Sequence, residues 1–470
     1  MTVSSATETS AVSRHVAVCP FPFSSHPATL LFLSRKIVVS SPGVHISFFT
    51  TESSATALKA SLPPEGLPTG IKFYHIEDGL AGESGWIHPL EAMRRFMEVS
   101  GETLRRSLAV AEEEIGVKIS CVVADAFLSF VCKEIADEKA VQWVALWTSA
   151  ASDLASHMYT DELRSRIATG EAHYEDSVDR HIPGFPPVTI ADLAPEVVVA
   201  DLATSSIARM LQIMSHTLTS ASSVVMNSFH TLEPDITVSL NSAFNNIFLS
   251  AGPYSLTLSP PDHGGAVHDP SGCLPWLDTH VSAPASVVYI SFGTAHTPPP
   301  EEFTALAEAL EVVGVPFLWS LPNRFLACLP EGFIERTGKS GKGKVVTWAP
   351  QTSVLGHVAI GAQLTHCGWN SVTESIVSGV PMICRALAVA EQKFNERLVV
   401  SVWGIGVEVE GGKLTKAAAA RAVERVLLEE EGKKIRETIR GMKKLAEEAA
   451  AEPNGSSARN LNKFISIITT

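Results

Sequence analysis

Two polar side chains in the first half of the chain are suited to proton transfer. His26 follows the apolar segment HVAVCPF, and Asp125 follows the apolar segment ISCVVA. If both segments are parallel strands, their carboxyl ends share one sheet edge, where ligands bind. A neutral histidine can then remove a proton, and an aspartate can orient its imidazole. The ordinary alternatives are a helix start at His26, beside Pro27, and a helix N-cap at Asp125.

A second motif, GAQLTHCGWNSVTES at residues 361–375, could bind an anion. It passes from an apolar strand through a glycine-containing turn into a helix predicted to begin near Asn370. Free N–H groups and the positive end of the helix dipole favour a phosphate there, and His366 adds a donor. Ser371 and Glu374 also fit a capping box, so an ordinary helix start with Ser371 as N-cap is the alternative.

Length and composition narrow the class of protein. The chain has 470 residues, of which 45% are hydrophobic and 18% charged, so two globular domains are expected. A formal charge of -14 argues against nucleic acid and anionic membranes as partners. The polar first fourteen residues do not resemble a signal peptide, and no apolar run reaches membrane-spanning length. We therefore expect a cytoplasmic protein. We also expect it to be a monomer. Seven scattered cysteines favour buried free thiols.

The elements that must position these residues alternate in an α/β pattern. Short β-branched runs alternate with amphipathic segments, as in a parallel sheet with crossover helices. Helices are predicted at Leu90–Gly116 and Phe127–Glu138, and a third carries Phe303, Leu306, Leu310 and Val313 on one face before Gly314. The predicted strands are His15–Phe21, Val44–Thr50, Ile71–His75, Lys118–Ala124, Val141–Trp147, Ser222–Asn227, Val287–Ser291, Val315–Leu321, Lys344–Trp348, Gly361–Thr365 and Pro381–Arg385.

A change of composition divides the chain. The segment from Gly252 to Cys273 gathers proline, glycine, serine and histidine without periodicity. We therefore expect an N-terminal α/β domain over residues 1–252, a linker over 253–272 and a second α/β domain over 273–450. A final helix over 451–470 is expected to pack back on the first domain. Two α/β domains imply a ligand-binding cleft between them.

Several motifs together resemble the signature of plant secondary-product UDP-glycosyltransferases: WAPQ at 348–351, HCGWNS at 366–371, Glu374, and the pair Glu391 and Gln392. The resemblance implies the GT-B fold, two Rossmann-like domains facing across a cleft, and a UDP-sugar donor. It implies a catalytic dyad of His26 and Asp125. It assigns UDP binding to Ser24, Thr294, Ser320, Trp348, Ala349, Gln351, His366, Asn370, Ser371 and Glu374, sugar binding to Thr148, Trp369, Glu391 and Gln392, and the acceptor pocket to Leu90, His157 and Ala194.

Within that family the chain is most similar to flavonoid 3-O-glucosyltransferases, through PFPFSSH, VADAF, the IPG at 182–184 and the NSF that begins at Asn227. It departs from them at Leu90 and Ala194, which replace the acceptor-positioning glutamines typical of these enzymes. It departs again in RALAVAEQ at residues 385–392. There Ala386 replaces a proline, Glu391 replaces an aspartate, and one residue is added.

The reaction that the resemblance implies is a single inverting displacement. Glucose would pass from UDP-glucose to a hydroxyl of a flavonoid or related phenolic. Gln392 and Trp369 favour glucose as the sugar. The sequence has no Asp-x-Asp motif and no close cluster of metal ligands, so no metal and no cofactor are expected. Two alternatives stay open: C-glucosylation of a flavone ring, and a non-catalytic protein that binds UDP-sugar or a phenolic.

Overall fold

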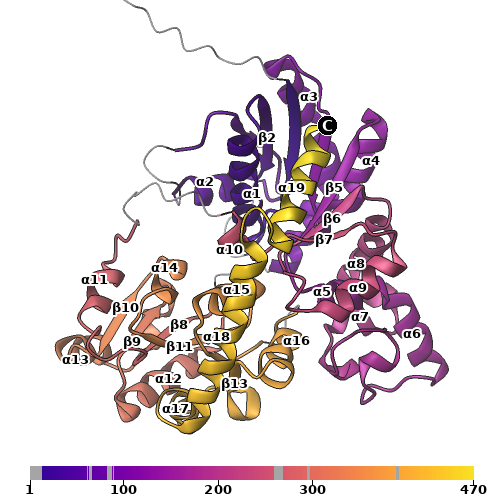
Figure 1. Ribbon diagram of the computed structural model, residues 1–470. Helices are drawn as coiled ribbons and strands as arrows, with labels where there is room; N and C mark the ends of the chain where they lie inside the picture. Colours follow the sequence, from indigo (N-terminus) through magenta and orange to yellow (C-terminus); the bar gives the residue numbers. More distant parts are fainter. Residues whose placement is uncertain are drawn as a thin grey trace, which may run out of the picture.

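Two parallel β-sheets organise the chain, one in each half (Figure 1). The structure is a computed structural model that describes residues 13–60, 62, 66–81, 87, 89–258, 268–293, 297–387 and 391–470. Thr294 and the middle of the expected linker lie outside the described residues. Strands of the first sheet fall between Arg14 and Ser250, and those of the second between Val287 and Glu408.

The first sheet has seven strands in the order β3-β2-β1-β4-β5-β6-β7, and every neighbouring pair is parallel. Its strands are β1 (Arg14–Cys19), β2 (Val44–Thr50), β3 (Ile71–His75), β4 (Cys121–Asp125), β5 (Gln142–Trp147), β6 (Ser223–Met226) and β7 (Phe248–Ser250). The strand order reverses between β1 and β4. In open parallel sheets, ligands bind beyond the carboxyl ends of the strands at such a reversal.

The second sheet repeats this topology with six strands, ordered β10-β9-β8-β11-β12-β13. They are β8 (Val287–Ser291), β9 (Phe317–Ser320), β10 (Gly343–Val346), β11 (Ile360–Thr365), β12 (Met382–Cys384) and β13 (Gly406–Glu408). This is the Rossmann order, with its reversal between β8 and β11. Strands buried on both faces need continuous apolar side chains, which is why the β-branched runs predicted them.

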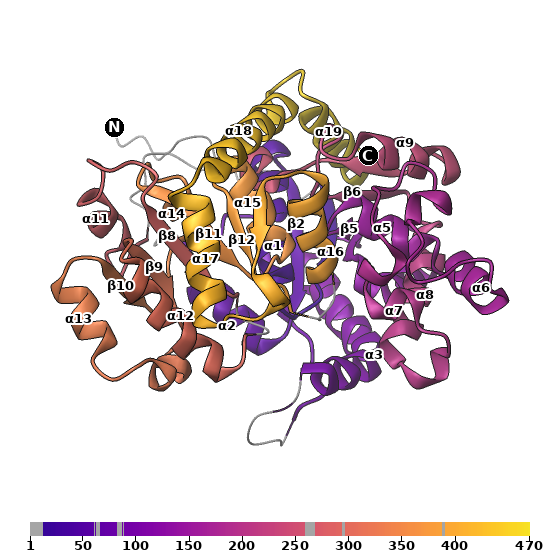
Figure 2. The ribbon, with the colours of Figure 1, turned by 90° about the horizontal axis from the view of Figure 1, so that it is seen from below.

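Helices cover both faces of each sheet. Helices α3 (Pro89–Ile115), α4 (Ser129–Lys139) and α8 (Ser206–Leu218) pack on one face of the first sheet, and α1 (His26–Ser40) and α19 (Ser456–Thr469) pack on the other. Helices α12 (Pro300–Val313) and α17 (Lys416–Leu427) cover one face of the second sheet, as seen from below (Figure 2). In the first half the helices are α1 (His26–Ser40), α2 (Glu52–Ala60), α3 (Pro89–Ile115), α4 (Ser129–Lys139), α5 (Ala151–Met158), α6 (Thr160–Thr169), α7 (Pro195–Val198), α8 (Ser206–Leu218), α9 (Pro234–Ala243) and α10 (Tyr254–Thr257).

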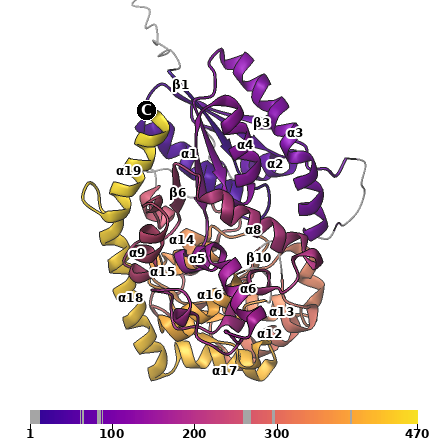
Figure 3. The same cartoon turned by 90° about the vertical axis from the view of Figure 1, so that its right-hand side faces the viewer.

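The second half contributes α11 (Cys273–Asp278), α12 (Pro300–Val313), α13 (Phe333–Lys339), α14 (Gln351–Leu355), α15 (Trp369–Ser378), α16 (Gln392–Arg397), α17 (Lys416–Leu427), α18 (Glu430–Ala450) and α19 (Ser456–Thr469). Helices α18 and α19 run along one edge of the molecule, from the second domain to the first (Figure 3). Leu461, Phe464, Ile465 and Ile468 of α19 pack into the same core as strands β1 and β2.

Local signals set several element ends as predicted. Pro27 stands in the first turn of α1, and Gly314 ends α12 with a φ of 70°, where a residue without Cβ is favoured. Two edge strands of three residues each, β7 and β13, were not predicted. All seven cysteines are free. Within the described residues, no helix is both long and apolar enough to cross a membrane.

Candidate active site

His26 and Asp125 meet where the strand order of the first sheet reverses. His26 is the first residue of α1, just beyond β1, and Asp125 is the last residue of the adjacent strand β4. His26 Nδ1 donates a hydrogen bond to Asp125 Oδ2 at 2.7 Å. The Asp125 side chain is 1% exposed and that of His26 is 17% exposed. This tautomer leaves Nε2 as the basic nitrogen of the imidazole.

Asp125 also caps the short 3₁₀ helix that follows it. Its Oδ1 accepts a hydrogen bond from the backbone N–H of Phe127 at 3.1 Å. Asp125 can therefore be both a helix N-cap and the partner of His26, because its carboxylate has two oxygens. The cap fixes the carboxylate, and the carboxylate fixes the ring of His26.

The surroundings of His26 are aromatic and acidic. The rings of Phe21 and Phe127 lie 5.8 and 5.4 Å from the imidazole, between ring centres. Burial acts to lower the pKa of His26, but the charge of Asp125, its hydrogen bond and the charge of Glu391 outweigh it and raise the pKa above its usual value. Thr148 Oγ1 lies 3.4 Å from Nδ1. The imidazole of His26 therefore binds a proton more readily than an ordinary histidine side chain does.

The predicted anion motif begins its helix earlier than expected. Helix α15 starts at Trp369 with Gly368 as N-cap, so Ser371 lies within the first turn, and the capping-box alternative is wrong. Glu374 Oε2 instead accepts a hydrogen bond from Gln351 Nε2 at 2.7 Å. A helix begins with free N–H groups whichever residue caps it, so the expected affinity for an anion is kept.

Three of the predicted UDP-binding residues form one hydrogen-bonded group. Gln351 Nε2 also donates to Ser371 Oγ at 3.1 Å, and Gln351 Oε1 accepts from the hydroxyl of Tyr289 at the same distance. Burial raises the pKa of Glu374, although its hydrogen bond with Gln351 lowers it. A carboxylate held in this way can accept hydrogen bonds from a ligand's hydroxyl groups.

The remaining predicted UDP contacts lie near the carboxyl ends of strands β9, β10 and β11. Trp348 is 45% exposed, an uncommon state for a large aromatic ring and one that leaves it open to stacking. Ala349 beside it is buried, and Ser320 ends β9 half-buried. In the first domain, Ser24 is exposed, with a φ of 57° in the left-handed region.

Two glycines make room for the ring of His366. A Cβ on Gly293 would lie 2.8 Å from His366 Cε1, and a Cβ on Gly368 would lie 2.6 Å from Nε2. Real Cβ atoms do not approach so closely, so a larger residue at either position would displace the imidazole. The glycines of SFG and HCG therefore set the position of the predicted phosphate donor.

Trp369 and Asn370 reach across to the first domain. The indole N–H of Trp369, which is 3% exposed, donates to the carbonyl oxygen of Asn227 at 2.7 Å. Asn370 Nδ2 donates to Ser25 Oγ at 3.0 Å. The side chain of Trp369 therefore packs between the domains, and its contact with the sugar stays a prediction.

The altered segment near residue 386 is anchored at both ends. Arg385, at its start, forms a buried bidentate ion pair with Glu302, with nitrogen to oxygen distances of 2.7 and 2.6 Å. Gln392, the first residue of α16, is buried, and its Oε1 accepts from the N–H of Leu387 at 3.1 Å. Residues 388–390 lie outside the described residues. Glu391 precedes α16, close enough to His26 for its charge to affect the imidazole.

The three predicted acceptor residues differ in exposure. His157 of α5 is buried, its ring meets Trp147 edge-on, and its Nε2 lies 4.0 Å from Asp153 Oδ1. Burial, with a smaller effect of the charge of Arg164, lowers the pKa of His157 to about 4, so it is neutral at pH 7. Ala194 is buried just before α7, whereas Leu90 at the start of α3 is 46% exposed.

Sequence reasoning missed the residues that join the two domains. Ser25 and Asn227 stand 345 and 143 positions from Asn370, yet both hydrogen bond to it. The only signal was the segment NSF at Asn227, which marked a family resemblance and no contact. Hydrogen bonds between distant segments depend on the tertiary arrangement, which no local pattern contains.

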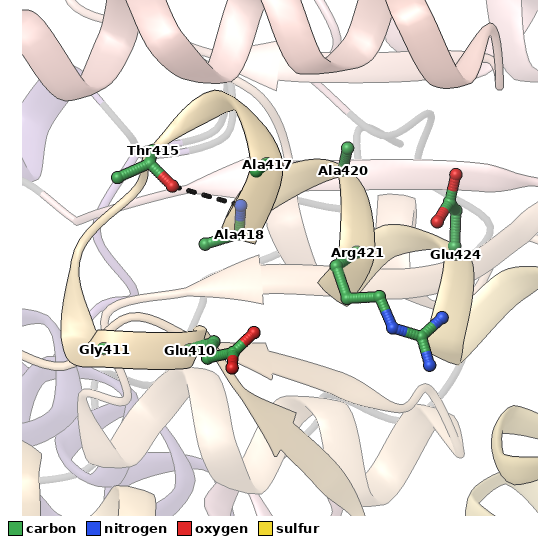
Figure 4. Close-up of a pocket in the computed structure, with 8 residues that line it drawn as sticks. All are labelled: Glu410, Gly411, Thr415, Ala417, Ala418, Ala420, Arg421 and Glu424. Carbon is green, nitrogen blue, oxygen red and sulfur yellow. Dashed lines mark hydrogen bonds between the residues drawn. The ribbon is translucent and has the colours of Figure 1, made fainter.

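A surface hollow lies apart from the predicted site residues. A hollow of about 520 Å³ at the start of α17 is lined by Glu410, Thr415, Arg421 and other residues, none of which is a predicted site residue (Figure 4). It lies at the end of the second domain away from the first (Figure 1). Among the residues that the structure describes, no three or more His, Cys, Asp or Glu side chains are grouped so as to hold a metal ion.

The chain is similar to known proteins over most of its length. A model of the UDP-glucoronosyl and UDP-glucosyl transferase family matches residues 68–453. The chain is 40% identical over 460 residues to an anthocyanidin 3-O-glucosyltransferase of Vitis vinifera, and 42% identical over 462 residues to an anthocyanidin 3-O-galactosyltransferase of Rhododendron delavayi. Each alignment covers 97% of both chains.

A solved structure is similar over nearly the whole length. The crystal structure of a UDP-glucose:anthocyanidin 3-O-glucosyltransferase in complex with UDP aligns with a TM-score of 0.87 and 33% identity, covering 97% of this chain and 99% of that one. The predicted GT-B fold of two Rossmann-like domains is confirmed. The chain belongs to the UDP-glucoronosyl and UDP-glucosyl transferase family and is a UDP-glycosyltransferase.

Proposed function

We propose that this UDP-glycosyltransferase transfers a sugar, preferentially glucose, from a UDP-sugar to a hydroxyl of a flavonoid, with inversion at the sugar carbon. The observation that carries the proposal is the 2.7 Å hydrogen bond between His26 and the buried Asp125 at the reversal of the first sheet. Relatives that act on anthocyanidins support the acceptor class.

His26 is the general base of this mechanism. Its Nε2 takes the proton of the acceptor hydroxyl while the hydroxyl oxygen attacks C1 of the sugar. The bond between C1 and the diphosphate oxygen breaks on the opposite face, which inverts the configuration. Asp125 keeps Nδ1 protonated and stabilises the imidazolium as it forms. The aromatic rings around His26 limit the access of water to the base.

The second domain holds the donor and stabilises the departing UDP. Trp348 stacks on the uracil, flanked by Ala349 and Ser320, and Gln351 bonds its edge. Glu374 accepts hydrogen bonds from the ribose. The diphosphate lies at the start of α15, where the helix N–H groups, His366, Asn370 and Ser371 balance its charge without a metal ion. Thr294 of the second domain and Ser24 of the first domain complete the set of UDP-binding residues.

The sugar and the acceptor lie between the two domains. Thr148, Trp369, Glu391 and Gln392 contact the sugar, and Gln392 favours glucose over galactose. His157, Leu90 and Ala194 border the acceptor. Because His157 stays neutral at pH 7, it can donate one hydrogen bond to a phenolic oxygen without adding charge.

A substrate panel tests the proposal directly. UDP release is measured with UDP-glucose and UDP-galactose against an anthocyanidin, a flavonol and a flavone, and the products are identified by NMR. A β-O-glucoside is expected, which acid hydrolyses. An acid-resistant product would indicate C-glucosylation, and binding of UDP without turnover on any acceptor would indicate a non-catalytic binder.

The variant His26→Ala is expected to lose about 10²–10⁴-fold in kcat, the usual contribution of a general base, with the affinity for UDP unchanged by calorimetry. His216→Ala is a matched control, because His216 forms an exposed pair with Asp161 on the surface, at 2.6 Å. Its kcat should equal that of the unmodified protein. Turnover of His26→Ala within twofold of normal would show that His26 is not the base.

A further inference from the structure

Asn227 stands in a chain of hydrogen bonds that joins the two domains. Its Nδ2 donates to Asn370 Oδ1 at 3.3 Å, and Asn370 Nδ2 donates to Ser25 Oγ at 3.0 Å. Asn370 is the second residue of α15, and Ser25 is the N-cap of α1, whose first residue is His26. This series of hydrogen bonds therefore passes through the donor motif at Asn370 and ends at Ser25, beside the base.

The direction of these hydrogen bonds is fixed by a backbone group. Asn227 Oδ1 accepts from the N–H of Tyr254 at 2.9 Å, and a backbone N–H can only donate. The carboxamide of Asn227 must therefore present its NH₂ group to Asn370. Asn370 Oδ1 is then the acceptor for the NH₂ group of Asn227, and the NH₂ group of Asn370 faces Ser25. Ser25 Oγ makes no capping bond to its own helix, so it can accept from the other domain.

The backbone of Asn227 is held as firmly as its side chain. Its N–H donates to the carbonyl of Trp147 at 3.0 Å, and its own carbonyl accepts from the indole of Trp369 at 2.7 Å. A Cβ on Gly252 would lie 2.6 Å from Asn227 Oδ1, so only glycine leaves space for the carboxamide there. Asn227 itself is 4% exposed.

We propose that Asn227 is a positioning residue that sets the distance between the sugar carbon and His26. It acts through Asn370, on the side of the diphosphate, and through Ser25, on the side of the base. Displacements near 1 Å at a reacting centre can cost about 100-fold in rate. Loss of the link should therefore slow transfer to the acceptor more than it weakens donor binding. The inference rests on the proposed role of His26.

Two variants of Asn227 separate positioning from folding. Asn227→Ala removes the link and the acceptor for Tyr254 N–H, whereas Asn227→Asp keeps an oxygen for Tyr254 and removes only the donor to Asn370. Asn241→Ala is the matched control. Asn241 Oδ1 accepts from the N–H of Phe248 at 3.0 Å and its Nδ2 donates to the carbonyl of Phe248 at 3.1 Å, both within the first domain.

For each variant the measurements are Tm, the kcat and KM of transfer, and the rate at which UDP-glucose is hydrolysed without acceptor. Both Asn227 variants should lose about 10–100-fold in transfer kcat, while Asn227→Ala changes the KM for UDP-glucose by less than about threefold. The ratio of hydrolysis to transfer should rise about tenfold. Asn241→Ala should lower Tm as Asn227→Ala does and leave that ratio unchanged.

Two results would overturn the inference alone: transfer within twofold of normal in both Asn227 variants, or a loss of kcat with the same ratio of hydrolysis to transfer as in Asn241→Ala. Normal turnover of His26→Ala would overturn the proposed function, and this inference with it. The two failures are distinct, because an inactive His26→Ala beside a fully active Asn227→Asp contradicts only the role of Asn227.

Discussion

At the scale of single residues, burial distinguishes two histidine–aspartate pairs of similar nitrogen-to-oxygen distance. His26 and Asp125 are 2.7 Å apart, and His216 and Asp161 are 2.6 Å apart. The second pair has side chains that are 63% and 49% exposed, where water screens the charges. In the first pair the carboxylate is 1% exposed, so its charge acts on the imidazole at low dielectric.

The pH dependence of catalysis should report this difference. A base must be unprotonated, and the pKa of His26 is raised, so kcat/KM should fall as the pH drops through a value above 6.5, the usual pKa of histidine. In Asp125→Asn, the negative charge that raises the pKa of His26 is lost and the amide is a weaker acceptor, while burial still lowers the pKa. The acid limb should then move to lower pH, and the plateau should fall about 10⁴-fold.

The measurement is kcat/KM against pH, with an NMR titration of the His26 ring where the turnover of Asp125→Asn is too slow. An acid limb at the same pH in both proteins would assign that limb to another group. Asp161→Asn is the control, since its exposed pair plays no part in the proposed reaction.

Residue types and spacing predicted the candidate site residues, because each motif lies within a few positions of a predicted strand end. They did not predict Ser25 or Asn227 as partners of Asn370. They also placed the start of α15 one residue late, because a glycine N-cap has no side chain to mark it.

At the scale of elements, α5 depends on a carboxylate from elsewhere in the chain. Its own N-cap, Ala150, makes no side-chain cap. Glu233 supplies one instead, accepting from the N–H groups of Ala151 and Ser152 at 2.8 and 3.1 Å and from the Ser152 hydroxyl. A buried negative charge at the start of a helix is favourable. Glu233 therefore fixes the helix that carries His157.

Glu233→Ala should lower the free energy of unfolding by about 3 kcal/mol, since it leaves buried N–H groups without a partner. Since 1 kcal/mol shifts the Tm of a domain of this size by about 2–4 °C, Tm should fall by about 6–12 °C. Thermal and urea unfolding measure the effect. Glu171→Ala is the control, because the side chain of Glu171 is 64% exposed. Equal Tm values for the two variants would contradict the role of Glu233 as a cap.

The strands were predicted more reliably than such links. Buried β-branched and aromatic residues make up most of strands such as β2 and β8, and these strands were predicted at their observed limits. Lysine and glycine residues made the limits of β10 less clear, and β7 and β13 escaped notice as edge strands of three residues.

At the scale of the whole molecule, the last helix ties the end of the chain to its beginning. Asn460 Nδ2 donates to the carbonyl of Ser250 in β7 at 2.9 Å, and Arg14 of β1 hydrogen bonds to the carbonyl of Thr470. Phe464 is fully buried in the core that contains β1 and β2. Helix α18, which precedes α19, packs on α15 and α17 of the second domain.

Phe464→Ala should therefore destabilise the first domain from the far end of the chain, by about 3–5 kcal/mol, as for other buried phenylalanines. Urea unfolding followed by tryptophan fluorescence measures this. Lys463→Ala, one residue away and exposed, should have no effect. Well below the transition, kcat of Phe464→Ala should stay within twofold of normal. Equal stability of the two variants would mean that α19 is not docked as described.

The sequence alone determined the class of the molecule and the stretches that are candidates for its chemistry. Patterns of a few to a dozen residues, above all hydrophobic periodicity, indicate parallel strands, crossover helices and the turn after a strand. The tertiary structure decided which stretches meet. The resemblance implied the contact of His26 with Asp125, which lies where the strand order reverses. The link from Asn227 through Asn370 to Ser25 was not predicted, and it arises where the two domains touch. Such contacts depend on packing between segments about a hundred or more residues apart, which local sequence patterns do not specify.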